Sequence, residues 1–199
     1  MHEHSSNSSG SQPVTQPVSL AGYLLVASPY MLNPTFARTV ILVLQHNQEG
    51  AAGIVLNRPA GRSIQELWRQ ISRELPVVDR SFHLGGPLPG PMLALHRDKE
   101  LAEYQLPGNL YLATDRSHLE QLVTEPEQAF RLFIGHAGWG RGQLEAEISQ
   151  GVWMLLPLGG TEVFEDEAQL WPRSIRRVGR RVLESAIPSR LIPPDPSVN

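Results

Sequence analysis

The chain has 199 residues, a formal net charge of −3 and no cysteine. A chain of this length forms one large or two small domains and can bury a sizeable apolar core without disulfides. The absence of cysteine excludes disulfides, thiolate metal sites and a thiol nucleophile, and it fits a reducing cytosol. The mild negative charge gives no general affinity for nucleic acid or anionic lipid.

Nothing in the sequence indicates a membrane segment or a secretory signal. The longest apolar runs, such as Val40 to Leu44, are far shorter than a bilayer span requires. The N-terminus has no basic region followed by an apolar one. We therefore predict a cytoplasmic protein with no membrane partner.

Both ends of the chain are predicted to be tails. Residues 1–19 are rich in Ser, Gln, Asn and Pro and carry almost no apolar side chains, which predicts disorder. Residues 188–199, with three prolines between positions 192 and 199, form a second flexible tail. A single domain is expected over residues 20–187.

The first half of this domain combines strands and one helix. Strands are predicted over 22–27, 39–46 and 53–57, and the turn sequence at 47–50 joins the last two as a hairpin. A helix is predicted over 63–73, because Ser63 can cap it and Glu66 can complete a capping box. Its apolar face carries Ile64, Leu67, Trp68 and Ile71.

The second half mixes short strands with single helices. Strands over 81–84 and 92–96 flank the turn at 85–91, and further strands are predicted over 109–113, 130–134 and 152–156. Helices are predicted after Asp115, over 143–150 and over 168–185. This mixture favours an α+β fold over a doubly wound parallel sheet.

Four glycines flank Trp139 between Gly135 and Gly142, where a strand should pass into a helix. Glycine at this density indicates a sharp turn or a close approach of the backbone. A loop before a helix N-terminus can also bind an anion, but the spacing matches no known phosphate or dinucleotide pattern. Glu145 and Glu147 would repel a phosphate, so a structural turn is favoured. Trp139 is either an exposed platform or a lid on the core.

Two other turns concentrate polar residues. Asn57-Arg58-Pro59 ends a strand; Asn57 is expected to make a turn hydrogen bond, and Arg58 can clamp a carboxylate or phosphate. Gly85-Gly86-Pro87 forms another turn. Histidines at predicted strand ends offer a metal site, but no pair has a helical ligand spacing, so structural histidines are favoured and no metal or cofactor is predicted. These histidines are His46, His83, His96 and His136.

The last predicted helix carries a stripe of arginines. At helical periodicity they share one face, opposite Trp171, Ile175, Val178 and Val182, which should face the core. Such a stripe can contact nucleic-acid phosphates, but the acidic residues Glu162, Glu165, Asp166 and Glu167 lie nearby, and an ion-paired or solvated face is favoured. The stripe consists of Arg173, Arg176, Arg177, Arg180 and Arg181.

In these motifs the chain resembles the YqgE/AlgH family, also called DUF179 or UPF0301, over residues 20–185. The matching segments are Ser28-Pro29, Asn33-Pro34-Thr35-Phe36, His46-Asn47, Gly50, Gly53, Asn57-Arg58-Pro59, Leu84-Gly85-Gly86-Pro87, Leu95-His96, Gly135-His136-Ala137-Gly138-Trp139, Gly142-Gln143-Leu144-Glu145 and Glu147.

The resemblance implies a bacterial cytosolic protein with an α+β fold. Its sheets would be coiled or bifurcated, largely antiparallel, partly barrel-like and flanked by helices. The family carries a label as transcriptional regulators, but no DNA-reading helix-turn-helix is visible in this sequence, so the label supports little. The family has no established catalytic residues, and none is assigned here.

Three functions follow from these features. The first is a non-enzymatic binding or regulatory module for a protein or small-molecule partner. The second is a hydrolase or metal-dependent enzyme using His46, His96 or His136 with Glu145. The third is nucleic-acid binding through the arginine stripe. The candidate binding patch of the first function comprises His46, Asn57, Arg58, Pro59, Gly85, Gly86, Pro87, His96, Gly138, Trp139, Gly142, Gln143 and Glu145.

Overall fold

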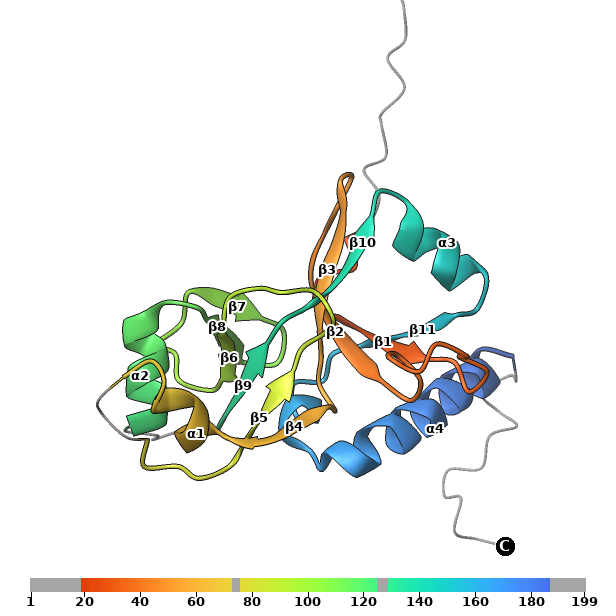
Figure 1. Ribbon diagram of the computed structural model, residues 1–199. Coiled ribbons are helices and arrows are strands. Elements are labelled where there is room, and N and C mark those ends of the chain that lie inside the picture. Colours follow the sequence, from red (N-terminus) through yellow and green to blue (C-terminus); the bar gives the residue numbers. More distant parts are fainter. Residues whose placement is uncertain (1–18, 73–75, 125–128, 187–199) are drawn as a thin grey trace, which may run out of the picture.

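A computed structural model describes residues 19–72, 76–124 and 129–186 (Figure 1). The predicted tails, 1–19 and 188–199, lie outside these residues except for Ser19. The described chain forms two sheets, which we call sheet A and sheet B. None of the helices in the described ranges has the length and hydropathy of a bilayer span.

Sheet A has five strands, all antiparallel to their neighbours. Its central strands β2 and β3 form the predicted hairpin, in which Asn47 pairs with Gly50. Strand β2 is rich in β-branched and apolar residues that are buried from Val40 to Val43, as expected for a strand covered on both faces. The spatial order is β10 (Ala137–Gly140), β3 (Gly50–Val55), β2 (Val40–Asn47), β1 (Tyr23–Ala27) and β11 (Trp153–Pro157).

Sheet B has six strands and a single parallel pair, β5 with β9, where His83 lies beside Phe133. The spatial order is β4 (Pro59–Ser63), β5 (Ser81–Leu84), β9 (Phe130–Ile134), β6 (Leu93–His96), β8 (Leu110–Ala113) and β7 (Tyr104–Leu106). The α+β prediction with largely antiparallel sheets is confirmed. In the described part of the chain both sheets stay open, so the architecture is two open sheets rather than a barrel.

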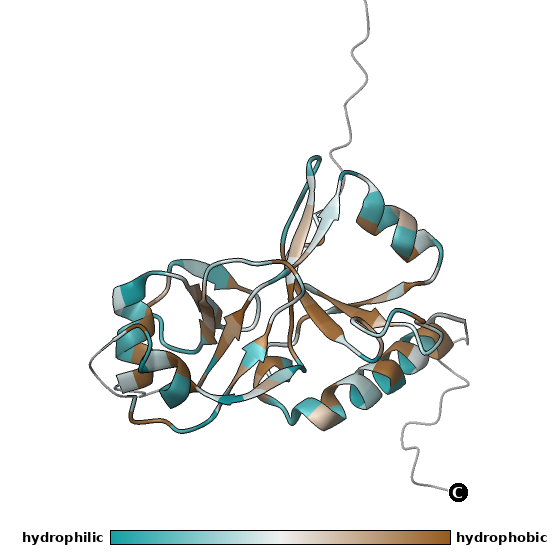
Figure 2. Cartoon of the chain, viewed as in Figure 1, coloured by the Kyte–Doolittle hydropathy of each residue, from teal (hydrophilic) through white to brown (hydrophobic). Residues whose placement is uncertain are grey.

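Helices cover the sheets from outside. Helices α1 (Ile64–Trp68) and α2 (Arg116–Thr124) lie against sheet B, α3 (Gln143–Ser149) lies at the far end of sheet A, and α4 (Glu167–Ala186) runs along sheet A after a short 3₁₀ turn, η1 (Glu162–Phe164) (Figure 1). Buried strands and the inner face of α4 are hydrophobic, whereas the outer face of α4 is hydrophilic (Figure 2). This contrast is the expected mark of an amphipathic helix on a sheet.

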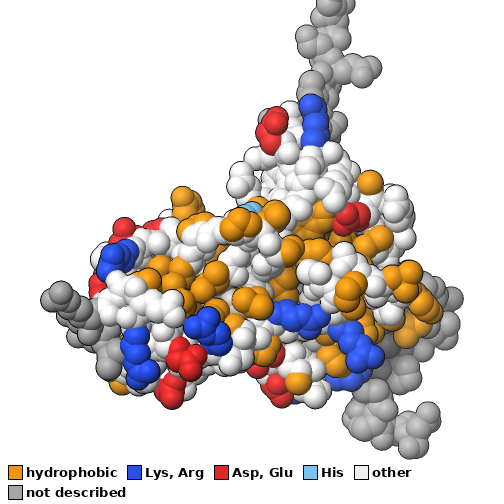
Figure 3. Space-filling model, viewed as in Figure 1, with side chains coloured by type: hydrophobic (Ala, Val, Ile, Leu, Met, Phe, Trp, Pro, Cys, Tyr) orange, Lys and Arg blue, Asp and Glu red, His pale blue; other side chains and the backbone are white. Residues whose placement is uncertain are grey.

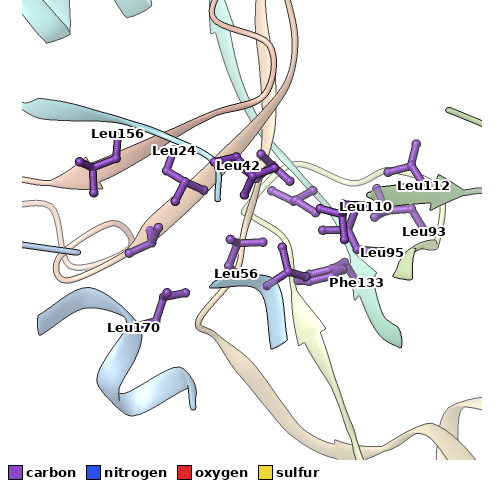
Figure 4. Packing of buried hydrophobic residues seen from close by; sticks show 14 of the residues in the cluster. Leu24, Leu42, Leu56, Leu93, Leu95, Leu110, Leu112, Phe133, Leu156 and Leu170 are labelled. Atoms are coloured by element: carbon purple, nitrogen blue, oxygen red, sulfur yellow. The ribbon is translucent and has the colours of Figure 1, made fainter. Parts of the chain in front are cut away.

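The largest core cluster joins both sheets to α4. Leu24 and Leu42 from sheet A, Leu95 and Phe133 from sheet B, and Leu170 from α4 contribute to it (Figure 4). Two further clusters lie under α1 and α2 and under α3. Because one core is shared by elements of both sheets, the two sheets pack as one body.

Helix α1 is shorter than predicted. The Ser63 hydroxyl accepts a hydrogen bond from the Glu66 amide at 3.2 Å, as expected of the cap. However, the Glu66 carboxylate lies 3.8 Å from Arg62 and the helix ends at Trp68. The amide of Ile71 bonds to Trp68 in a tighter turn, and the side chain of Ile71 is exposed instead of facing the core.

The glycine run after β9 is not the predicted loop. Residues Ala137–Gly140 form strand β10, which pairs with β3 and has Trp139 opposite Ala51. Strands β4 and β7 are also absent from the sequence prediction, because each is short and polar. The last helix is confirmed and begins at Glu167, but Val182, which is predicted to face the core, is exposed.

Candidate functional site

Two depressions meet at Pro59 and Glu167, between the start of α4 and the β4–β5 edge of sheet B. Their volumes are about 380 Å³ and 400 Å³. We call them together the arginine groove. The first is lined by Pro59, Arg80, Ser81, His83, Ala129, Phe130, Arg131, Phe164 and Glu167, and the second by Arg38, Asn57, Arg58, Pro59, Asp166, Glu167, Ala168, Trp171 and Pro172.

The carboxylate of Glu167 lies at the centre of the groove. Its Oε1 atom lies 2.8 Å from His83 Nε2 and 3.1 Å from Arg131 Nη2. The side chain of His83 is 4% exposed, whereas that of Glu167 is 32% exposed. Burial would raise the pKa of Glu167, but its bonds to His83, its own amide and Arg131 outweigh that effect and lower the pKa.

Two arginines line the first depression from sheet B. Arg131 projects from β9, and its Nη2 atom also donates to the Glu165 carbonyl at 2.5 Å. Its Nη1 atom is buried and has no hydrogen-bond partner among the described residues. Arg80 lies over the ring of Phe130 at 4.4 Å and donates to the Phe130 carbonyl at 3.3 Å. Burial lowers the pKa of both guanidinium groups, because removal from water disfavours the charged form.

Two more arginines line the second depression. Arg38 lies over the ring of Trp171, 5.7 Å from its centroid, and Arg58 donates to the Ala37 carbonyl at 2.6 Å. The Trp171 indole N–H donates to the Ala27 carbonyl at 2.9 Å, which fixes the ring between α4 and β1. Asp166 caps α4 by accepting from the Ala168 amide.

The groove is locally positive although the chain is not. Four arginines face two carboxylates along its walls, which leaves two positive charges in excess, while the whole chain carries −3. Arginine side chains gather in the lower part of the surface shown in Figure 3, where β4, β5 and α4 approach one another. A concave, positively charged site of this kind raises the local concentration of anions.

The predicted patch is only partly assembled. Arg58 and Pro59 line the groove, and the Arg58 carbonyl accepts from the Leu84 amide on β5. Asn57 is 6% exposed, with Oδ1 accepting from the Val40 amide and Nδ2 donating to the Arg38 carbonyl. The amide group of Asn57 thus ties the end of β3 to the start of β2, and Arg58 is the residue of this turn that supplies a charge to the groove.

The Gly85-Gly86-Pro87 turn packs against the backbone before β10. A Cβ on Gly86 would lie 2.2 Å from the carbonyl carbon of His136, and one on Gly85 would lie 2.2 Å from the Gly135 oxygen. The Gly85 carbonyl accepts from the Val55 amide. These glycines let three chain segments cross closely where sheet A meets sheet B.

The remaining patch residues lie on β10 and α3. Trp139 is 7% exposed, so it covers the core and is not an exposed platform. Gly142 begins α3 with a φ of 70°, Gln143 accepts from the Gly140 amide, and Gly138 packs against Leu88. Figure 1 shows α3 at the top and β4 at the bottom of the view, and no residue of β10 or α3 lines the arginine groove.

His46 and Glu145 form a separate pair. His46 Nδ1 accepts from the Leu20 amide at 3.1 Å, so Nε2 carries the proton and donates to Glu145 Oε1 at 2.8 Å. The pKa of Glu145 is lowered, first by its own backbone amide at the start of α3 and then by His46. Both imidazole nitrogens are occupied, so neither is available as a base in this arrangement.

His96 lies inside sheet B, far from its predicted partners. It is fully buried, and neither ring nitrogen makes a hydrogen bond of normal geometry within the described chain. Within the described ranges no group of three or more His, Asp or Glu side chains is placed to hold a metal ion. Glu145 therefore meets His46 and not His96.

We expect the free energy of unfolding to fall as the pH drops below about 6.5. Burial lowers the pKa of His83 and His96, so below their unfolded-state pKa the unfolded chain binds more protons than the folded one. The stabilisation is complete above about pH 6.5 and is lost as the pH falls toward the folded pKa values, by at most about 1.4 kcal/mol per pH unit for each histidine.

Urea denaturation between pH 5 and 8 tests this pH dependence. The variant His96→Phe keeps a ring in the site and should flatten the profile, because it removes one of the two histidines whose pKa is lowered by burial. An identical slope in wild type and His96→Phe contradicts a contribution from His96.

The arginine stripe on α4 is partly neutralised. Arg173 pairs with Glu165 at 3.1 Å, and Arg177 pairs with the buried Glu162 at 2.5 Å. Arg176, Arg180 and Arg181 are exposed and form no ion pair among the described residues. The prediction of an ion-paired or solvated face fits these positions, and nucleic-acid binding through them stays a prediction.

Sequence reasoning missed most of the groove. It groups His83 with the other strand-end histidines, connects Glu167 only with the arginine stripe, and does not single out Arg38, Arg80 or Arg131. One signal is visible: Arg131 interrupts the apolar strand sequence Phe-Arg-Leu-Phe-Ile, and a charged residue inside such a strand needs a buried partner.

Comparison with known proteins gives a consistent relationship. The AlgH-like family model, DUF179, matches residues 24–183. A UPF0301 protein of Burkholderia vietnamiensis is 35% identical over 161 residues, covering 76% of this chain and 84% of that protein. A UPF0301 protein of Myxococcus xanthus is 37% identical over 168 residues, covering 80% and 91%.

Solved structures agree with this. The solution structure of the AlgH protein from Pseudomonas aeruginosa matches with a TM-score of 0.68 at 28% identity, covering 92% of this chain and 98% of that one. The crystal structure of protein DIP2367 from Corynebacterium diphtheriae matches with a TM-score of 0.64 at 25% identity, covering 78% and 85%. By sequence and by fold, the chain belongs to the AlgH-like (DUF179, UPF0301) family.

Proposed function

We propose that this protein is a non-enzymatic binding module that holds a small dianion in the arginine groove. The observation that carries the proposal is the excess of two positive charges in a concave site on a chain of net charge −3. The chemistry recognised is a carboxylate or phosphate group, the natural partner of guanidinium. We assign the module to the cytoplasm, which the absence of cysteine supports.

The groove has the size and composition of a ligand site. Each depression is within the usual range for small-molecule pockets, and aromatic side chains, Phe130 and Phe164 on one side and Trp171 on the other, line it together with the charges. Arg80 and Arg131 are partly desolvated, so a bound anion would interact with them more strongly than in water.

The histidines support binding over hydrolysis. In a catalytic His–Glu pair the nitrogen opposite the carboxylate faces the substrate. In His46 that nitrogen accepts from the Leu20 amide, and in His83 it is buried. Neither histidine therefore offers a base to a molecule in the groove.

A thermal-shift titration with succinate and with inorganic phosphate tests the proposal. Saturating dianion should raise the melting temperature of the wild type by several degrees, because only the folded chain binds it. Arg80→Ala and Arg38→Ala, which each remove one groove charge, should lose most of this shift.

Arg62→Ala is the matched control, because Arg62 is 59% exposed on β4 and pairs only with Glu66 among the described residues. It removes the same charge outside the groove and should keep the full shift. Anions also stabilise proteins without a site, and that effect would persist equally in all three variants. Equal shifts in all three, or no shift in the wild type, reject the proposed function.

A further inference from the structure

The carboxylate of Glu167 occupies the position where the ligand anion of the proposed function is expected. A single oxygen, Oε1, accepts a hydrogen bond from His83 Nε2 and forms an ion pair with Arg131 Nη2. These donors lie on neighbouring strands, β5 and β9, whose parallel pairing holds them in register. The groove is thus already closed at its centre by an anion that belongs to the protein itself.

The contact with Arg131 is incomplete. Guanidinium binds carboxylate or phosphate most strongly through two parallel N–H···O bonds. Glu167 engages Nη2 alone, and Nη1 is buried without a partner among the described residues. An anion that accepted hydrogen bonds from both Nη1 and Nη2 would give Nη1 the partner that it lacks. It would thereby offset the free-energy cost of burying that donor unpaired.

Glu167 is free to leave without unfolding the helix. Its side chain is one-third exposed, so it can rotate into solvent. The cap of α4 belongs to Asp166, whose carboxylate accepts from the Ala168 amide and whose carbonyl accepts from the Leu170 amide. The first turn of α4 therefore keeps its own hydrogen bonds when the Glu167 carboxylate leaves His83 and Arg131.

We infer that the dianion binds by displacing the Glu167 carboxylate from His83 and Arg131, which removes the side-chain attachment of Glu167 in the first turn of α4 to sheet B. This inference rests on the proposed function and adds its regulation: an internal carboxylate competes with the ligand, and occupancy of the groove is coupled to the attachment of α4. Trp171, one turn further along α4, donates to the Ala27 carbonyl of β1, so beyond its first turn the helix is tied to sheet A.

The test compares Glu167→Gln and Glu167→Ala with the control Glu165→Gln. Glu165 lies two residues away, and its carboxylate pairs with Arg173 outside the groove. Glu165→Gln therefore removes the same charge from a carboxylate that contacts neither His83 nor Arg131. Binding of inorganic phosphate and of succinate is followed by NMR through backbone amides and arginine Nε–H signals.

Without its competitor the ligand should bind more tightly. We expect both Glu167 variants to bind phosphate about tenfold more tightly than the wild type, because the charge of Arg131 is left for the ligand to compensate. Glu165→Gln should change the affinity less than about threefold, through the general field alone. The backbone amide signals of residues 167–171 should shift when phosphate is added to the wild type, and in Glu167→Ala they should already lie near the shifted positions.

The outcomes separate the two proposals. Suppose that phosphate and succinate bind the wild type, but that Glu167→Gln and Glu167→Ala bind them more weakly or change the affinity no more than Glu165→Gln does. Glu167 then positions the donors, so displacement is rejected while the binding function stands. If neither dianion binds the wild type, the proposed function itself fails. Circular dichroism confirms that each variant is folded before titration.

Discussion

Replacing Gly86 with alanine is expected to lower the free energy of unfolding by more than about 4 kcal/mol. The added Cβ would lie 2.2 Å from the carbonyl carbon and 2.3 Å from the carbonyl oxygen of His136. Both are backbone atoms, so no side-chain rotation can relieve the overlap. The segment before β10 would have to move away from β5, and with it the junction of the two sheets.

Gly61→Ala is the control for this prediction. Gly61 has a φ of +68°, but apart from Gly61 and its two chain neighbours no described residue has an atom within 4 Å of the position that a Cβ would occupy. Its replacement should cost only the conformational penalty, about 1–2 kcal/mol. Urea denaturation at about pH 7.5, where the buried histidines are neutral in both states, measures both losses. Equal losses would show that crowding at the sheet junction is unimportant.

Glu147→Ala is expected to cost about 3 kcal/mol of unfolding free energy. The Oε2 atom of Glu147 accepts from the indole N–H of Trp139 at 2.9 Å and from that of Trp153 at 2.7 Å. Both tryptophans are buried, with exposed fractions of 7% and 3%. Alanine would leave two buried donors without an acceptor and would remove the hydrogen bonds that join α3 to β10 and β11.

Glu147→Gln separates the hydrogen bonds from the charge. A glutamine oxygen can still accept from both indoles, so the loss should stay below about 1.5 kcal/mol. Denaturant unfolding of the two variants under the same conditions provides the comparison. If Glu147→Gln is as unstable as Glu147→Ala, the negative charge matters more than the acceptor.

Strands whose residues are densely apolar, or alternate between apolar and polar, could be predicted from the sequence. Strands that are stabilised only by pairing with a neighbouring strand could not. Residues 81–84 and 130–134 have the predicted bounds, because burial on both faces leaves a largely apolar run. Strand β10 contains two glycines and no β-branched residue, yet it pairs because β3 offers it an edge. Tertiary context overrides strand propensity there.

The candidate site shows the same division. Arg58 and Pro59 can be identified because a turn sequence marks them. His83, Arg131 and Glu167 come from three separate stretches of chain, and only the pairing of β5 with β9 and the packing of α4 bring them together. No local sequence pattern predicts that these three residues lie close together. The only indication is Arg131 itself, because an arginine inside an apolar strand needs a buried partner.

The place of β1 in sheet A affects the order in which the sheet can form during synthesis. Strand β1 lies between β2 and β11, and its residue Ala27 pairs with Trp153 near the other end of the domain. On the ribosome β1, β2 and β3 emerge first, but the outer edge of β1 has no partner until nearly all of the domain has been synthesised. Pairing across such a distance is slow, so sheet A is completed only after β11 has been synthesised, and until then the nascent chain exposes an apolar edge that chaperones can cover.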